Sequence, residues 1–286
     1  MKGIRGFPGL ALALGLLVSA QDLRETEQLY QHTDYDGALR LLRNSHSQDA
    51  GTYLLAGKCN LMKGDFKKAT EEFQKVVNLE PQNSDAMLWL GRSWARRAET
   101  ASPFIAPMNA SQARQCFEKA VALNTNPKNH EAMDDLFDFY LDAPGFLGGG
   151  FDKAEALAAR IEQVDPAQGH YDRAEIARKR KEFGQSEQEL RRAVQLGPHE
   201  LGHLMALARF LAHQGRIQES DAVISQAAKA APGNPRLLYG RARIYVETHR
   251  NLDEARSLLE QYLHSNLTPD DPSREEARKL LKQAGA

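Results

Sequence analysis

Apolar and polar residues alternate along the chain in a pattern that returns at long intervals. The copy at residues 53–81 reads YLLAGKCNLMKGDFKKATEEFQKVVNLEP, with apolar residues three and four positions apart on either side of Gly64. That spacing predicts two amphipathic helices, because residues three and four apart share one face of a helix. The Gly64-Asp65 pair predicts a turn between the two helices, and Pro81 predicts the end of the second.

The same order of apolar, small and proline positions returns over most of the chain. The later copies are marked by Gly91 with Phe117, Ala154 with Pro166, Leu190 with Pro198, Ala208 with Pro232, and Ala242 with Leu259. An earlier and degenerate copy carries Tyr35, Ala38 and Leu42. The interval from Pro198 to Pro232 is 34 residues. Because one helix pair cannot bury its apolar stripe alone, stacked pairs must complete the core, which predicts an all-α solenoid.

These repeats resemble the tetratricopeptide repeat family over residues 22–269. Small residues such as Gly57 and Ala69 let the two helices of a repeat approach each other, and Phe73 fills the space between them. The resemblance implies a superhelix of about seven helix-turn-helix repeats. We predict this solenoid over residues 21–270 and a capping helix over 271–286, opened by a capping box from Ser273 to Glu276.

Two segments break the period of the repeat. Residues 96–110 insert about ten residues between the two helices of the third repeat, and they include Phe104 and Ile105. Residues 143–150, APGFLGGG, lengthen the corresponding turn of the fourth repeat by about five residues. We predict both as loop insertions. They either cover exposed core at one edge of the stack or contribute to function.

The N-terminal segment has the pattern of a secretory signal peptide. Lys2 and Arg5 precede the apolar run at residues 10–18, and small residues follow up to Ala20. The run is far shorter than the roughly 20 residues that a membrane-spanning helix needs. We therefore predict a signal peptide over residues 1–20, cleavage after Ala20, a periplasmic or secreted protein, and no membrane span after cleavage. The alternative is a buried N-terminal helix.

Composition and charge narrow the class of protein. The chain has 37 Lys and Arg against 38 Asp and Glu, a net charge of −1 that becomes −3 when Lys2 and Arg5 are removed. A nucleic-acid-binding protein normally carries a basic excess, so no nucleic-acid partner is predicted. Charged residues make up 26% and hydrophobic residues 42%, which excludes both a disordered tail and a multi-span membrane protein.

One sequence matches the helix motif of zinc proteases. His199, Glu200 and His203 fit H-E-x-x-H, which requires both histidines on one face of a continuous helix. Pro198 precedes the match directly, and the repeat places His199 and Glu200 in a turn between two units. A chance match is the preferred interpretation, and a zinc-dependent hydrolase is the remote alternative.

No other segment predicts enzymatic chemistry, and no cofactor or metal is predicted. The glycines at residues 148–150 precede a helix but lack the Lys-Ser/Thr ending of a nucleotide-binding loop. The basic run at residues 178–181 has flanking glutamates and is interpreted as a solvated helix face. Cys59 and Cys116 are too few for a disulfide framework, and the sequence leaves open whether they form one bond or remain free.

The resemblance implies that the first helices of the repeats line a concave groove that holds a peptide or a partner helix. By register, one groove position per repeat is occupied by Lys58, Arg92, Asp138, Glu175, Arg209 and Arg243. Neighbouring positions include Leu61, Arg96 and Arg178. The predicted groove is basic at both ends and acidic around the fourth repeat. Arginine residues are suited to partner binding because they pair with carboxylates through two hydrogen bonds.

The function predicted from these features is that of an exported scaffold that binds a protein or peptide in the groove. The predicted binding residues are Lys58, Leu61, Arg92, Arg96, Asp138, Arg178, Arg209 and Arg243. The alternative is a structural or assembly factor of the cell envelope. A further possibility is that the inner face is merely solvated and binds nothing.

Overall fold

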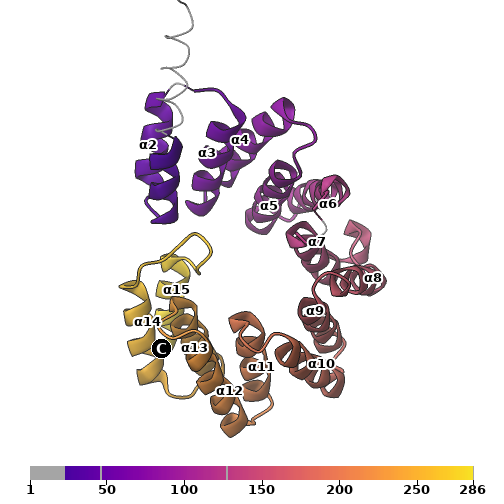
Figure 1. Ribbon diagram of the computed structural model, residues 1–286, viewed down its shortest axis with the longest axis vertical. Coiled ribbons are helices and arrows are strands. Elements are labelled where there is room, and N and C mark those ends of the chain that lie inside the picture. Colours follow the sequence, from indigo (N-terminus) through magenta and orange to yellow (C-terminus); the bar gives the residue numbers. More distant parts are fainter. Residues whose placement is uncertain (1–22, 46, 127, 286) are drawn as a thin grey trace, which may run out of the picture. The chain divides into compact units, whose positions relative to one another are not determined.

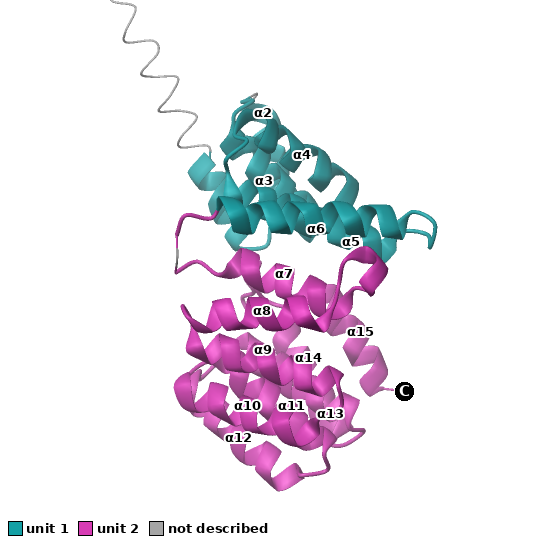
Figure 2. Ribbon diagram, turned by 90° about the vertical axis from the view of Figure 1, so that its right-hand side faces the viewer, with its two compact units in different colours: residues 1–123 teal, residues 124–286 magenta. Residues whose placement is uncertain are grey.

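The computed structural model describes residues 23–45, 47–126 and 128–285, and the regular structure of these residues is entirely helical (Figure 1). The predicted signal peptide at residues 1–20 lies outside the described residues. The chain divides into two compact units, Met1–Leu123 and Asn124–Ala286, which we call unit 1 and unit 2 (Figure 2). Each unit is described by itself.

Unit 1 is a stack of antiparallel helices. Residues 23–31 are helical, and the helices that follow are α2 (Tyr35–Ser45), α3 (Ala50–Met62), α4 (Phe66–Leu79), α5 (Ser84–Thr100) and α6 (Ala106–Leu123). α3 packs on α4 and α5 packs on α6, as the repeats predict.

Unit 2 continues the same alternation in pairs that start with α7, α9, α11 and α13. Its elements are α7 (Glu131–Asp142), the short 3-10 helix η1 (Gly145–Leu147), α8 (Phe151–Glu162), α9 (Pro166–Lys179), α10 (Phe183–Leu196), α11 (Leu201–His213), α12 (Ile217–Ala230), α13 (Pro235–Glu247), α14 (Leu252–Leu263) and α15 (Arg274–Ala284). Within this unit α7, α9 and α11 lie on the inner side of the curve, and α8, α10 and α12 lie on the outer side (Figure 1). The all-α solenoid predicted from the repeats is confirmed.

Close contact between the helices of a repeat depends on the small residues that the sequence placed there. A Cβ atom added to Gly57 would lie 2.5 Å from the Phe73 ring, and one added to Gly91 would lie 2.6 Å from the Phe117 ring. Phe73 is fully buried, so its ring occupies the space that a side chain at position 57 would need. The glycines therefore set the distance between α3 and α4 and between α5 and α6.

The capping helix forms as predicted. The Ser273 hydroxyl accepts a hydrogen bond from the Glu276 backbone N–H, and the Glu276 carboxylate accepts one from the Ser273 backbone N–H. α15 then buries Ala277, Leu280 and Ala284 against the preceding helices. This reciprocal cap satisfies donors at the helix start and fixes the end of the stack.

The segment at residues 96–110, predicted as a loop, is mostly helical. α5 continues to Thr100 and α6 begins at Ala106, so only five residues separate them. Pro107 lies in the first turn of α6, where a missing N–H costs no hydrogen bond. Phe104 is 95% exposed at the tip, so it covers no core there. The extra residues lengthen both helices.

The segment at residues 143–150 combines the short helix η1 with a glycine turn. A Cβ atom at Gly149 would lie 1.8 Å from the Ala143 carbonyl oxygen, and Gly148 and Gly150 have φ values of 94° and 149°. These positions require glycine for steric and conformational reasons. The Gly-rich sequence is therefore explained by the turn itself.

Candidate functional site

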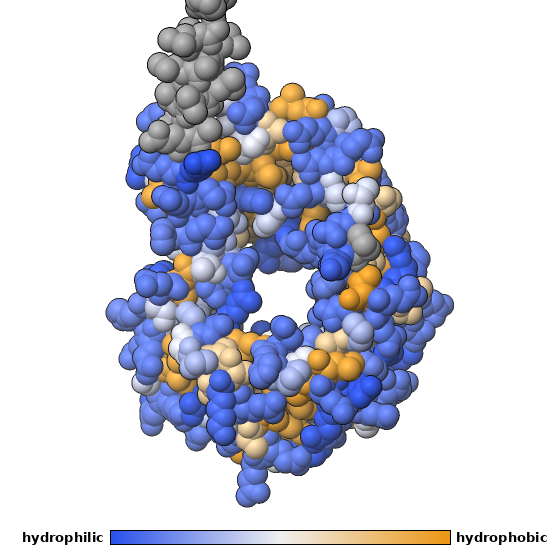
Figure 3. Space-filling view, viewed as in Figure 1, coloured by the Kyte–Doolittle hydropathy of each residue, from blue (hydrophilic) through white to orange (hydrophobic). Residues whose placement is uncertain are grey.

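The predicted groove residues fall on both units and form two separate sets. Lys58, Leu61, Arg92 and Arg96 lie on α3 and α5 of unit 1, and Asp138, Arg178, Arg209 and Arg243 lie on α7, α9, α11 and α13 of unit 2. We call these helix surfaces the inner face of unit 1 and the inner face of unit 2. Hydrophilic and hydrophobic side chains lie next to each other along the inner edge of unit 2 (Figure 3).

On unit 1, two of the predicted cations share one aromatic ring. The Lys58 ammonium lies 4.8 Å and the Arg92 guanidinium 4.7 Å from the centre of the Trp89 ring. Trp89 in turn stacks on Phe73 with ring centres 6.0 Å apart. The core thus supports a platform on which the cations are held by the negative face of the ring. We call Lys58, Trp89 and Arg92 the cationic cluster.

Nearby carboxylates offset part of the positive charge on the inner face of unit 1. Lys58 also lies 3.8 Å from the Asp85 carboxylate, and Arg96 pairs with Glu99 at 2.5 Å. The Arg96 guanidinium lies 5.2 Å from the Phe66 ring centre. Cations on this face are therefore oriented by neighbours within unit 1 before any partner arrives.

On α11 and α13 of unit 2, the predicted cations Arg209 and Arg243 both contact Glu247, a residue that was not predicted to lie in the groove. Arg209 holds Glu247 through two hydrogen bonds of 2.6 and 2.9 Å, and Arg243 reaches it at 2.8 Å. His213 is a third neighbour at 3.1 Å. Partial burial raises the pKa of Glu247, but the hydrogen bonds from these three residues outweigh it and leave the pKa below its usual value.

Glu247 therefore reduces the positive charge expected at this end of the groove. Glu247 lies four positions after Arg243 on α13, a spacing that permits an ion pair on the helix surface and that sequence alone could have indicated. The contact from Arg209 on α11 could not be read in that way, because it joins two different repeats.

Carboxylates crowd the inner face of unit 2 between α7 and α9. Asp134, Asp138 and Asp142 follow each other at four-residue intervals on α7, and Asp172 and Glu175 face them from α9. We call these five residues the acidic cluster. The prediction of an acidic groove around the fourth repeat rested on fewer residues, because Asp172 was not recognised.

Several carboxylates of the acidic cluster already have ion-pair or hydrogen-bond partners. Arg178 donates two hydrogen bonds to Glu175, at 2.6 and 3.0 Å. Lys179 contacts Asp142 at 2.5 Å, and His130 contacts Asp134 at 2.8 Å. The basic run at residues 178–181 therefore serves local ion pairs on solvated helix surfaces, and Arg180 pairs with Glu155 at 2.6 Å.

Crowding changes the protonation of this cluster. Asp138 has an exposed side chain, and desolvation by the surrounding residues, followed by the charges of Asp135, Asp142 and Asp134, raises its pKa to about 7. Asp172 is 1% exposed, and burial followed by the charge of Asp134 raises its pKa to about 8. Burial also raises the pKa of Asp134. At neutral pH the cluster therefore retains protons that ordinary carboxyls would have lost.

The histidines of the zinc-protease match are separated by the start of a helix. α11 begins at Leu201, so His199 and Glu200 lie in the preceding turn. His203 is buried, its Nε2 lies 3.2 Å from the Gln168 side-chain oxygen, and its ring stacks on Tyr171 with centres 5.3 Å apart. Among the described residues no three His, Cys, Asp or Glu side chains are grouped so that they could hold a metal ion. His203 is a core residue between α9 and α11.

Both cysteines are free thiols, which resolves the question that the sequence left open. Cys59 and Cys116 are buried in unit 1 and are not bonded to each other. Burial raises the pKa of Cys59 to about 12 and the pKa of Cys116 to about 11. Thiols with such values carry little thiolate at neutral pH and are poor nucleophiles.

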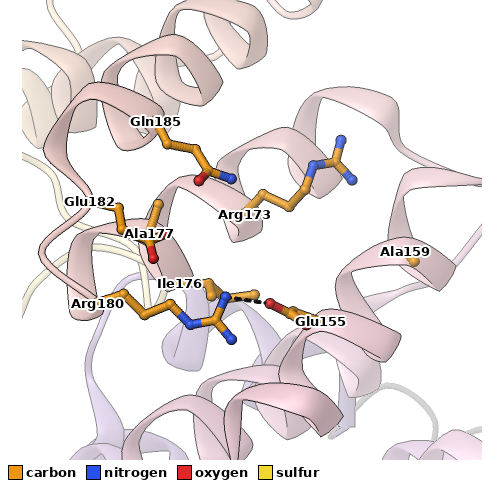
Figure 4. A pocket seen from close by; sticks show the side chains of 8 residues that line it. All are labelled: Glu155, Ala159, Arg173, Ile176, Ala177, Arg180, Glu182 and Gln185. Carbon is orange, nitrogen blue, oxygen red and sulfur yellow. Dashed lines mark hydrogen bonds and ion pairs between the residues drawn. The ribbon is translucent and has the colours of Figure 1, made fainter.

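A pocket of about 240 Å³ lies between α8, α9 and α10 of unit 2 (Figure 4). Most of its charged lining is already paired, because Arg180 contacts Glu155 at 2.6 Å and Arg173 holds Glu162 at 2.6 and 2.7 Å, while Glu182 also lines it. The pocket therefore presents little unmatched charge to a small ligand. The sequence analysis did not indicate it.

Comparison with known proteins identifies the repeats. The family model described as "Tetratricopeptide repeat" matches residues 171–235 and 205–272, and a second model with the same description matches residues 50–83. No curated protein sequence matches the chain. No helix in the described part of the chain has the length and apolar character needed to cross a membrane.

Two solved structures resemble the fold. A tetratricopeptide repeat protein from Parabacteroides merdae superimposes with a TM-score of 0.60 at 13% identity, covering 93% of this chain and 98% of that one. The protein TTC0263 from Thermus thermophilus, also a tetratricopeptide repeat protein, gives a TM-score of 0.54 at 20% identity, covering 67% of this chain and 98% of that one. At these identities the similarity bears on the fold alone.

Proposed function

This chain belongs to the tetratricopeptide repeat family, and on that premise we propose that it binds a partner protein or peptide through the inner faces of its repeats. Such repeats generally mediate interactions between proteins, and proteins built from them are typically scaffolds without enzymatic activity. The predicted binding residues of unit 1 and unit 2 provide charged contacts for this purpose, and Trp89 adds an aromatic one in unit 1.

The cationic cluster of unit 1 is the observation that carries the proposal. Tryptophan and arginine are the residue types that most often dominate the energy of protein interfaces. The contacts of Lys58 and Arg92 with the Trp89 ring limit the freedom of two long side chains before binding. Binding a partner then costs less side-chain conformational entropy, which favours binding of a segment that carries carboxylates.

Affinity purification from an envelope fraction tests this proposal. The double variant Arg92→Glu with Arg209→Glu reverses one charge on each inner face, and we expect it to weaken partner capture by about tenfold or more. The matched control is Lys67→Glu with Arg192→Glu, which makes the same charge changes on α4 and α10. Failure to recover any partner, or equal capture by both double variants, would contradict binding through the inner faces.

We also propose that the mature protein acts in the periplasm or outside the cell. The basic start, the apolar run at residues 10–18 and the small residues up to Ala20 support this location. N-terminal sequencing of the protein recovered from the envelope should give Gln21 as the first residue. Intact protein that starts at Met1 and remains in the cytosol would contradict export. Partners drawn from envelope-assembly machinery would favour the role of an assembly factor.

A further inference from the structure

We infer that the acidic cluster of unit 2 receives a cationic side chain, lysine or arginine, from the partner segment. This inference rests on the proposed function and specifies the chemistry of the partner at one site. It differs from the carboxylate binding that the cationic cluster of unit 1 favours.

The cluster has more carboxylates than cations. Lys179 and Arg178 contact Asp142 and Glu175, and a ring nitrogen of His130 contacts Asp134. Within the described residues, neither Asp138 nor Asp172 forms an ion pair. Asp138 is also exposed, so its carboxylate is open to a ligand that approaches the inner face.

A second observation comes from buried oxygens inside the cluster. One carboxyl oxygen of Asp172 accepts a hydrogen bond from Gln168 at 2.9 Å, while its other carboxyl oxygen is buried without a hydrogen-bond partner in the described structure. One oxygen of Asp134 is in the same state. A buried oxygen without a partner destabilises the fold. These unpartnered oxygens lie in the acidic cluster, where a bound cation would offset the negative charge of the neighbouring carboxylates.

The surrounding groups suit an ammonium or guanidinium group better than a metal ion. Tyr171 lies beside the cluster, and its pKa is raised by burial and by the charges of Glu175, Asp138 and Asp172. An aromatic ring next to carboxylates forms a favourable environment for an organic cation. The described side chains provide no group of three His, Cys, Asp or Glu that could hold a metal. An acidic partner segment would meet repulsion here.

Binding of a cation at this site is coupled to protons. A nearby positive charge favours the ionised carboxylate, so binding lowers the pKa of Asp138 and releases a proton near neutral pH. Affinity should therefore increase from about pH 6 to about pH 8, the range set by Asp138 and Asp172. The charged or titratable groups that act on these two carboxyls are Asp134, Asp135 and Asp142 of α7 and Tyr171, Arg173 and Glu175 of α9. Around them, His130 at the N-cap of α7 contacts Asp134, Arg178 contacts Glu175, and His203 of α11 stacks on Tyr171.

Fluorescence anisotropy with defined peptides tests the inference on the full chain. The probe is a labelled alanine-rich peptide with two arginines, and the comparison peptides carry two glutamates or two glutamines in the same places. We expect the arginine peptide to bind, and Asp138→Asn to weaken it by about fivefold. Glu260→Gln on α14 removes one carboxylate charge elsewhere in unit 2 and should change the affinity by less than about twofold.

Calorimetry in two buffers with different heats of ionisation supplies a second readout. Wild-type protein should release protons when the arginine peptide binds at pH 7, and Asp138→Asn should release fewer. Equal loss of affinity in Asp138→Asn and Glu260→Gln, or no binding of the arginine peptide, would overturn the inference. Preferential binding of the glutamate peptide through Arg92 would overturn it as well, while leaving the proposed function intact.

Discussion

Lys58 and Arg92 of unit 1 lie over the ring of Trp89, whereas Asp138 and Asp172 of unit 2 form no ion pair among the described residues, although the charge of Arg173 acts on Asp172. A cation beside an aromatic ring is stabilised whatever the pH near neutrality. A carboxyl beside other carboxyls is destabilised when it ionises, so its charge depends on pH. One repeat architecture thus presents a constant positive surface in one unit and a proton-dependent negative surface in the other.

The largest expected effect concerns the core that supports the cationic cluster. Phe73 is fully buried, packs against Gly57 and stacks on Trp89. Phe73→Ala should lower the free energy of unfolding by about 3–5 kcal/mol, because it removes a large ring and leaves a cavity. Denaturant unfolding followed by circular dichroism measures this loss.

Gly57→Ala provides a matched test of the same contact. In the wild-type protein the new methyl group would lie 2.5 Å from the Phe73 ring, so it should destabilise the fold. In the Phe73→Ala background the methyl group enters the cavity, and the change should be neutral or stabilising. An identical effect in both backgrounds would mean that the Phe73 ring does not set the helix spacing in unit 1.

The next largest effect concerns the acidic cluster, where a substitution should stabilise the protein. Folded Asp172 holds its proton up to about pH 8, whereas the unfolded chain loses it near the ordinary aspartate pKa of 3.8. The folded state therefore binds more protons, and stability falls as pH rises between these values. Asp172→Asn removes this penalty while retaining an oxygen that can accept the Gln168 hydrogen bond, and should stabilise the protein by about 2 kcal/mol at pH 8.

Unfolding measured over a range of pH provides the check. The difference between Asp172→Asn and wild type should shrink towards acidic pH, where both side chains are neutral. A difference that does not vary with pH would show that Asp172 is ionised in the folded state or that its cost has another origin.

Sequence reasoning worked where the determining contacts are local or repeat with the period. Gly57, Phe73 and the capping box from Ser273 to Glu276 each belong to a pattern that is visible within one repeat or one helical turn. It was wrong about the loop at residues 96–110, because the positions next to Pro107 can begin a helix.

Contacts between repeats could not be predicted in the same way. Glu247 binds Arg209 from 38 residues away, and His203 contacts Gln168 from 35 residues away. Each contact depends on the rotation of two separate helices and on the side-chain conformations at their surfaces. The burial of Asp172 likewise depends on how separate helices pack together, and no motif marks it.

A smaller effect is expected for the ion pair between Arg209 and Glu247 in unit 2, which can be compared with the contact of Arg92 and Trp89 in unit 1. Glu247 is shared by Arg209 and Arg243, and both pairs are partly exposed. A double-mutant cycle with Arg209→Ala and Glu247→Ala should give a coupling of about 0.5–1 kcal/mol. Increasing salt should reduce this coupling, since the pair is accessible to ions.

The corresponding cycle between Arg92 and Trp89 sharpens the comparison. A cation on an aromatic ring should give a coupling of similar size, about 0.5–1 kcal/mol, but with weaker dependence on salt and no carboxylate involved. If both cycles respond equally to salt, the positive surface of unit 1 is held by ion pairs rather than by the Trp89 ring.

A last comparison concerns two corresponding turns, one in each unit, that use different residue types. The turn between α3 and α4 of unit 1 uses Gly64 with φ 79°, and that between α9 and α10 of unit 2 uses Lys181 with φ 64°. Gly215, 34 residues after Lys181, has φ 74° in the next turn of unit 2. A left-handed conformation costs a residue with a side chain about 1 kcal/mol, and glycine avoids that strain.

Exchanging the two residue types should therefore shift stability in opposite directions. Lys181→Gly should stabilise the protein by about 0.5 kcal/mol, because relief of strain exceeds the entropy that glycine adds to the unfolded chain. Gly64→Lys should destabilise it by about 1 kcal/mol. Thermal unfolding of both variants measures the two shifts. If Lys181→Gly destabilises instead, the Lys181 side chain contributes contacts that outweigh the strain of its backbone.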